Sequence, residues 1–138
     1  MEQQQIFAPV TALVFLTLLV WLFMYHKRLG FMRRQKLDPE ALKSKTEGEK
    51  ILAPVAGPSD NLKNLFEMPV LFYLLCIVLF VLSRVDATFL NLAWAYVGLR
   101  ALHSLIQSTY NRIVHRFSVY MLSMIVLVWM WLRFALAT

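Results

Sequence analysis

Residues 100–111 read Arg100-Ala-Leu-His103-Ser-Leu-Ile-Gln107-Ser-Thr-Tyr-Asn111, a polar pattern within an otherwise apolar segment. Arg100, His103, Gln107 and Asn111 are spaced by three, four and four residues, which places them on one face of a helix over about three turns. An arginine near the middle of a membrane-spanning helix costs roughly 2.5–3.5 kcal/mol on insertion scales. This face therefore needs a protein interior or a wet cavity, with polar partners supplied by the rest of the chain.

The composition is that of a membrane protein. The 138 residues are 59% hydrophobic and 16% charged, and the mean hydropathy is +0.60, whereas soluble domains carry about 25% charged residues. The length predicts a single domain covering residues 1–138. Fourteen basic residues outnumber eight acidic ones, but they lie between apolar runs, which indicates membrane topology rather than binding to nucleic acid.

The apolar runs predict an all-α integral membrane protein, a four-transmembrane-helix antiparallel bundle. The expected spans cover about residues 6–25, 62–82, 88–110 and 117–135. The first run lacks a preceding positive region and is too long for a signal-peptide core, so we expect a retained membrane helix. The lone cysteine, Cys76, lies within an apolar run, where it is expected to pack as a small hydrophobic residue.

Residues 26–61 are expected to form a basic loop. Asp38 and Pro39 are typical of a helix start, with Asp38 as the cap, whereas the two prolines and the glycine within residues 51–60 predict a loop. Pro69 falls inside the second span and should kink it. The short connection at residues 83–86 makes the third span the antiparallel neighbour of the second.

Ten of the fourteen basic residues lie in the first and third connections, if Lys63 is assigned to its helix. The positive-inside rule then places these two connections in the cytoplasm and both termini outside. A bacterial inner membrane is favoured as the host, with the endoplasmic reticulum as the alternative.

Several ionisable residues converge on one level of the predicted membrane. Glu67 lies in the first turns of the second span, and Arg100 can extend toward it because long basic side chains reach for the membrane boundary. Glu67, Arg100 and His103 are therefore expected to form a polar cluster open to the cytoplasm. A structural ion pair between Glu67 and Arg100 is the simplest alternative, although intramembrane ionisable residues are functional by default.

These residues also carry a family likeness. The pattern resembles the MAPEG family, the membrane-associated proteins in eicosanoid and glutathione metabolism, over essentially the whole chain. The residues that match are Asn64, Glu67 and Pro69 in the second span, Arg100 and His103 in the third, and Arg116 and Tyr120 entering the fourth.

The resemblance implies a homotrimer with active sites between subunits, a membrane lipid environment, glutathione as the cofactor and a lipophilic small molecule as the substrate. Asn64 and Glu67 would hold the backbone and amino group of glutathione. Arg116 would favour its thiolate, since a nearby cation lowers the pKa of a thiol. The remaining residues implied to bind its carboxylates or surround its sulfur are Arg100, His103 and Tyr120, with a looser match at Arg33 or Arg34.

Two positions depart from the family pattern. Asp60 stands four residues before Asn64, where members that use glutathione usually carry a basic residue, and Gln107 stands where a tyrosine is common. Lys63 would replace the missing cation one turn along, and Gln107 would face the same ligand.

Three functions fit these observations. The first is a glutathione-dependent transferase or peroxidase that acts on lipophilic electrophiles or lipid hydroperoxides. The second is a non-catalytic protein of the same fold that binds a lipid or another anionic ligand, which Asp60 and Gln107 favour. The third is a small transporter or channel with Arg100 facing a pore, although the sequence has no pair of broken helices typical of transporters.

Overall fold

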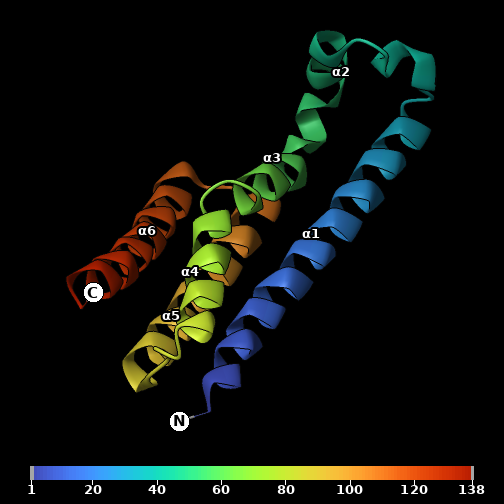
Figure 1. Cartoon of the computed structure of the whole chain (residues 1–138). Coiled ribbons are helices and arrows are strands. Elements are labelled where there is room, and N and C mark those ends of the chain that lie inside the picture. Colours follow the sequence, from blue (N-terminus) through green and yellow to red (C-terminus); the bar gives the residue numbers. More distant parts are fainter. Residues whose placement is uncertain (1, 138) are drawn as a thin grey trace.

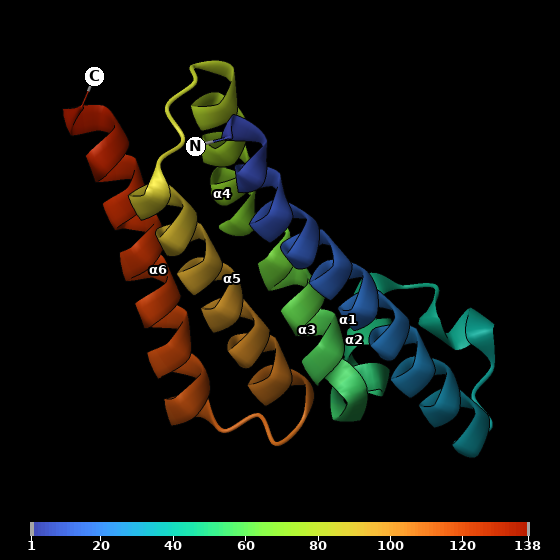
Figure 2. The ribbon, with the colours of Figure 1, turned by 90° about the horizontal axis from the view of Figure 1, so that it is seen from below.

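The computed structural model describes residues 2–137, which form a set of helices whose long members run side by side (Figures 1 and 2). The α-helices are α1 (Phe7–Arg34), α2 (Lys45–Leu52), α3 (Ala56–Leu65), α4 (Pro69–Val81), α5 (Ala87–Ser108) and α6 (Ile113–Leu136). Short 3₁₀ turns lie at η1 (Gln3–Ile6), η2 (Pro39–Leu42) and η3 (Ala53–Val55). The all-α prediction is confirmed.

Three helical segments of the described chain are long and apolar enough to cross a membrane: Gln3–Arg34, Lys45–Val81 and Ile113–Leu136. The helix α5 has 22 residues and is about 33 Å long, so its length suffices for a crossing. The polar face of α5 makes its mean hydropathy lower than that of the three segments named above. The third of the four predicted spans, at about residues 88–110, therefore stays a prediction.

The prediction for residues 26–61 is partly wrong. The helix α1 continues through the basic residues to Arg34, and its last turn carries Arg33 and Arg34, which favours a helix C-terminus because cations complement the dipole there. The expected cap is confirmed, since the amide of Glu40 donates to Asp38 Oδ1 at 3.0 Å and Pro39 begins η2.

Residues 51–60, expected to be a loop, are helical. Pro54 lies in the first turn of η3 and Pro58 in the first turn of α3, where a proline needs no amide hydrogen to donate. The two prolines thus mark helix starts and do not interrupt helices.

The kink predicted at Pro69 is confirmed as a complete break. The helix α3 ends at Leu65 and α4 begins at Pro69. Between them the backbone makes turn-type bonds, with the amide of Val70 donating to the Glu67 carbonyl at 3.2 Å and that of Leu71 to the Met68 carbonyl at 2.9 Å. One predicted span is therefore two rods that meet at residues 66–68 (Figure 1).

The α4–α5 connection reverses the chain, as expected. Ser83 adopts a left-handed conformation with φ 52°, and Asp86 caps α5 by accepting a bond from the amide of Phe89 at 2.9 Å. The helix α5 then returns alongside the N-terminal part of α1 and against α6 (Figure 2). The connection from α5 to α6 lies at the end of the bundle where α3 begins.

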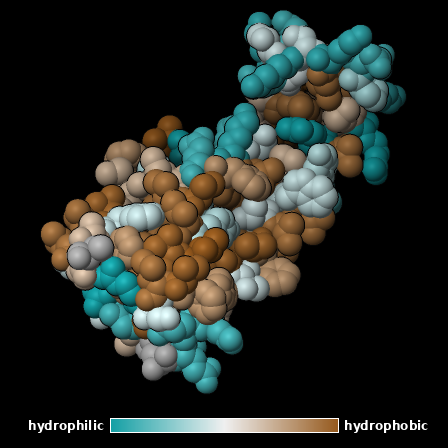
Figure 3. Space-filling view, in the orientation of Figure 1, coloured by the Kyte–Doolittle hydropathy of each residue, from teal (hydrophilic) through white to brown (hydrophobic). Residues whose placement is uncertain are grey.

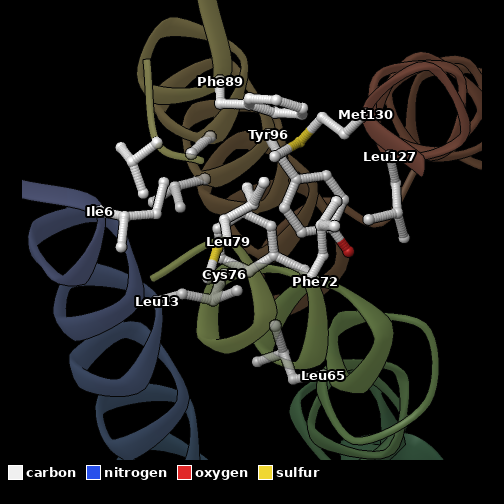
Figure 4. Packing of buried hydrophobic residues seen from close by; sticks show 14 of the residues in the cluster. Ile6, Leu13, Leu65, Phe72, Cys76, Leu79, Phe89, Tyr96, Leu127 and Met130 are labelled. Carbon is white, nitrogen blue, oxygen red and sulfur yellow. The ribbon is translucent and has the colours of Figure 1, made fainter. Parts of the chain in front are cut away.

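The apolar core joins α1, α4, α5 and α6 (Figure 4). Phe72 of α4 stacks on Tyr96 of α5 with ring centroids 4.7 Å apart. Cys76 is fully buried among these side chains, as predicted. The lateral surface of the helices is also largely apolar, and the hydrophilic residues gather toward the ends (Figure 3), which is the surface expected of a protein surrounded by lipid.

Candidate functional site

A polar pocket of about 220 Å³ lies between α3, α5 and α6, at the end of the bundle nearer to α2. Two apolar side chains, Ile113 and Phe117, form part of its wall. Its polar lining residues are Asn64 of α3, His103 and Gln107 of α5, and Arg116 and Tyr120 of α6. The structure thus brings together five of the eight residues singled out from the sequence.

Arg100 lies next to this pocket and is completely buried. The guanidinium carbon is 5.6 Å from the centroid of the Tyr120 ring, a distance typical of a cation–π contact. None of the three guanidinium nitrogens has a hydrogen-bond partner among the described residues. Because an unsatisfied buried polar group is costly, such groups call for a functional explanation.

His103 lies one turn further along α5 and is 2% exposed. Its ring centroid is 5.8 Å from that of Tyr120, and its Nδ1 has no hydrogen-bond partner among residues 2–137. Tyr120 therefore contacts both Arg100 and His103 from α6. Buried polar atoms without a hydrogen-bond partner, beside a cavity, are typical of sites that bind a polar ligand.

Polar contacts between α3 and α5 hold one side of the pocket in place. Asn64 Nδ2 donates to Gln107 Oε1 at 3.2 Å. One turn earlier, the fully buried Asn61 donates to Ser108 Oγ at 3.2 Å and accepts from Ser104 Oγ at 3.1 Å. These bonds fix the side chains of Asn64 and Gln107 relative to each other.

The backbones of α3 and α5 also approach closely. A Cβ atom added to Gly57 would lie 2.7 Å from the carbonyl oxygen of Gln107, closer than real Cβ contacts. Glycine at position 57 thus permits the spacing that the Asn61 and Asn64 hydrogen bonds require.

Arg116 is positioned by the turn that precedes α6. Its Nη1 donates to Asn111 Oδ1 at 2.8 Å, and Asn111 itself has φ 50°. Asparagine tolerates this left-handed conformation better than most residues. The polar face noticed in the sequence therefore ends in a residue that orients Arg116 from the turn, while Arg100, His103 and Gln107 stay within α5.

Two of the residues singled out from the sequence lie elsewhere. Glu67 is exposed in the break between α3 and α4, and among residues 2–137 no ion pair joins it to Arg100. The alternative of a structural Glu67–Arg100 ion pair is thus not formed, because the break ends the helical face that Glu67 would share with Asn64. Lys63 pairs with Glu49 at 3.9 Å and faces a different hollow, which Asp60 also lines.

Sequence reasoning missed Ile113 and Phe117. Their spacing could have predicted this position, because residues 113, 116, 117 and 120 follow the three- and four-residue steps of one helix face. The charge of the pocket follows from its lining: Arg116 contributes a cation, Arg100 lies beside it, and no carboxylate of the described chain lines it. The pocket therefore favours an anionic or electron-rich ligand.

An all-α membrane protein with a basic, half-buried pocket between its helices is the class that this fold and site define. Within that class, the family model of the MAPEG family matches residues 6–136. The chain therefore belongs to the MAPEG family and is an integral membrane protein related to glutathione and eicosanoid metabolism. No curated protein and no solved structure matches the chain.

Proposed function

We propose that the protein is a membrane-bound, glutathione-dependent transferase or peroxidase acting on lipophilic electrophiles or lipid hydroperoxides. The observation that carries this proposal is the buried Arg100, whose nitrogens have no partner among residues 2–137 although it lies beside the pocket of Arg116, His103 and Tyr120. Glutathione carries two carboxylates and a thiol, and guanidinium groups are well suited to bind carboxylates.

Glutathione would supply a nucleophilic sulfur. Arg116 is half-buried and fixed by Asn111, so its charge would stabilise a thiolate and lower the pKa of a bound thiol. Tyr120, beside it in the pocket, would present its hydroxyl to the same sulfur. Arg100 and His103 of α5 would bind a carboxylate of glutathione, and the side-chain amides of Asn64 and Gln107 would bind its peptide backbone.

The pocket is smaller than the roughly 300–1,000 Å³ typical of small-molecule sites. A tripeptide bound there would extend beyond it. We therefore propose that a neighbouring subunit of a homotrimer supplies the remaining contacts to the ligand. Glu67, exposed at the break, is available for such a contact.

The test is glutathione binding to the detergent-purified protein by calorimetry, with the variants Arg116→Ala and Arg112→Ala. Arg112 is a matched control because it is an exposed arginine of the same connection that does not line the pocket. We expect Arg116→Ala to weaken binding at least about tenfold, which corresponds to about 1.4 kcal/mol, and Arg112→Ala to leave it unchanged. Equal affinities in wild type and Arg116→Ala would remove the proposed thiol site.

A second candidate is a non-catalytic protein that holds a lipid or another anionic ligand in the same pocket. Two observations favour it: Glu67 does not line the pocket, and the Gln107 side-chain oxygen is already bonded to Asn64. This candidate predicts a co-purifying ligand without turnover. Mass spectrometry of the purified protein, combined with an assay of glutathione conjugation to a lipophilic electrophile, separates it from the first.

A further inference from the structure

Two hollows on the α1–α5 side of the molecule adjoin each other, and one of them shares Gln107 with the polar pocket. The first, the apolar groove, has a volume of about 460 Å³, and the second, the basic hollow, about 550 Å³. Ser108 and Thr109 line both. The two hollows therefore form one continuous depression with an apolar part and a polar part.

The apolar groove follows from the side chains of two parallel helix faces. Leu16, Leu19 and Phe23 of α1 line one side, and Ala101, Ser104 and Leu105 of α5 line the other. Both sets follow steps of three and four residues, so each occupies a single helix face. Small side chains at positions 101 and 104 leave the space, which extends for about two helical turns, or about 10 Å.

The basic hollow continues from the groove toward the end of α1. Lys27 and Arg34 line it from one face of α1, seven residues or about two turns apart. Neither forms an ion pair with any of residues 2–137. Asp60 of α3 lines the hollow too and offsets part of this charge. Two cations against one carboxylate leave the hollow positive.

Lys27 lies at the boundary between the two hollows. Its Nζ is 5.4 Å from the centroid of the Phe23 ring, and Phe23 lines the apolar groove. Ser108 adds a hydroxyl at the same boundary, where its oxygen accepts a bond from Asn61 Nδ2 at 3.2 Å. A cation, a hydroxyl and an apolar slot thus meet where α1 leaves its apolar run for the basic segment.

We propose that this depression binds one anionic glycerophospholipid, with an acyl chain in the apolar groove and the phosphate between Lys27 and Arg34. Charge complementarity and continuity with the apolar groove specify this occupant, because a soluble phosphate would not use the groove and a neutral lipid would not use the cations. Basic hollows between membrane helices at the positive end of a protein commonly receive anionic lipid headgroups. The site shares Gln107 with the polar pocket, but its apolar groove and both of its cations lie outside that pocket. Lipid binding there does not depend on glutathione use.

The experiment is native mass spectrometry of the full-length protein in non-ionic detergent, titrated with dioleoyl phosphatidylglycerol or dioleoyl phosphatidylcholine. We expect wild type to bind phosphatidylglycerol about tenfold or more tightly, since each basic residue near an anionic headgroup contributes a factor of about five. Lys27→Gln combined with Arg34→Gln should reduce this preference to near one. Wild type with equal affinity for both lipids would overturn the proposal.

Two further variants make the result specific. Lys36→Gln combined with Lys43→Gln removes the same charge from exposed positions outside the hollow. This variant should keep the preference for phosphatidylglycerol over phosphatidylcholine. A loss of preference equal to that of the Lys27 and Arg34 variant would overturn the proposed site, because only the overall charge of the segment would then matter. Ala101→Leu should fill the apolar groove and weaken both lipids. Unchanged lipid binding by Ala101→Leu, or a shift to a smaller assembly, would overturn the proposal, the latter by identifying the face as a subunit interface.

Discussion

Arg100 lies against the ring of Tyr120, with its guanidinium carbon 5.6 Å from the ring centroid, and its nitrogens have no hydrogen-bond partner among the described residues. The contact joins α5 to α6 directly beside the polar pocket. A fully buried cation with no hydrogen bond or ion pair among the described residues does not hold the bundle together, because burial of an unpaired charge costs free energy. Its presence is better explained by ligand binding than by stability.

Replacing Arg100 should therefore stabilise the protein and impair binding. Arg100→Met keeps a long apolar side chain and removes the unsatisfied donors, each of which costs about 1–3 kcal/mol when buried. We expect the midpoint of thermal unfolding in detergent to rise by several degrees while glutathione binding falls. A lower midpoint would mean that a partner subunit satisfies Arg100 in the assembly.

Gly57→Ala should destabilise the contact between α3 and α5. The added methyl group would lie 2.7 Å from the Gln107 carbonyl oxygen, a backbone atom that cannot move aside alone. Overpacking of this kind typically costs about 1–3 kcal/mol. The matched control is Gly98→Ala in α5, where the added Cβ meets nothing within 4 Å; this variant should be stabilised by up to about 1 kcal/mol. The test is the midpoint of thermal unfolding of both variants. Equal shifts in the two midpoints would contradict the predicted clash at position 57.

Asn61 and Ser104 should be energetically coupled. The Ser104 hydroxyl donates to Asn61 Oδ1 at 3.1 Å, and both side chains are buried. A double-mutant cycle with Asn61→Ala and Ser104→Ala should give a coupling of about 0.5–3 kcal/mol. Additive effects of the two substitutions on the free energy of unfolding would mean that the bond contributes nothing to the α3–α5 contact.

Asp86 should make stability depend on pH. Partial burial raises the pKa of this carboxyl, but the hydrogen bonds from the Phe89 amide and Arg133 outweigh that effect, so the pKa lies below its ordinary value. A lowered pKa in the folded state means that the carboxylate stabilises folding above its unfolded pKa, and that this stabilisation is lost as the pH falls through the folded value. The unfolding midpoint should drop between about pH 5 and about pH 3.

The control for this prediction is Asp86→Asn. Asparagine keeps an N-cap oxygen and loses the ion pair with Arg133, which is 2.9 Å from Asp86 and partly exposed. Such an ion pair contributes up to about 1 kcal/mol, whereas loss of the cap in Asp86→Ala costs about 1 kcal/mol more. The Asn variant should show a smaller drop at acidic pH; an identical drop would assign the effect to other carboxyls.

The apolar runs predicted the long helices because a membrane-spanning backbone must satisfy its own hydrogen bonds, and a helix does so within the run. The polar residues of α5 were found for the same reason, since an arginine inside such a run demands an explanation. The four-residue spacing of Arg116 and Tyr120 likewise placed both on one helix face, because spacing can be taken from the sequence alone.

What the sequence could not reveal depends on where helices stop. Pro54 and Pro58 favour a loop on composition, yet each lies in a first helical turn, and the choice depends on how α2 and α3 pack against α1. The orientation of Glu67 depends on the three residues of the break, and a short non-helical segment can turn a side chain toward either side. The closeness of Gly57 to Gln107 is a tertiary contact that single-sequence patterns do not encode.

The break at residues 66–68 has a mechanical consequence. A continuous helix resists bending because bending stretches its ladder of hydrogen bonds, whereas this segment is held by local turns only. The segment 66–68 is therefore a hinge between α4 and the helix α3, which carries Asn61 and Asn64. A force on the α2–α3 arm would tilt one wall of the polar pocket and leave the apolar anchor of α4 in place.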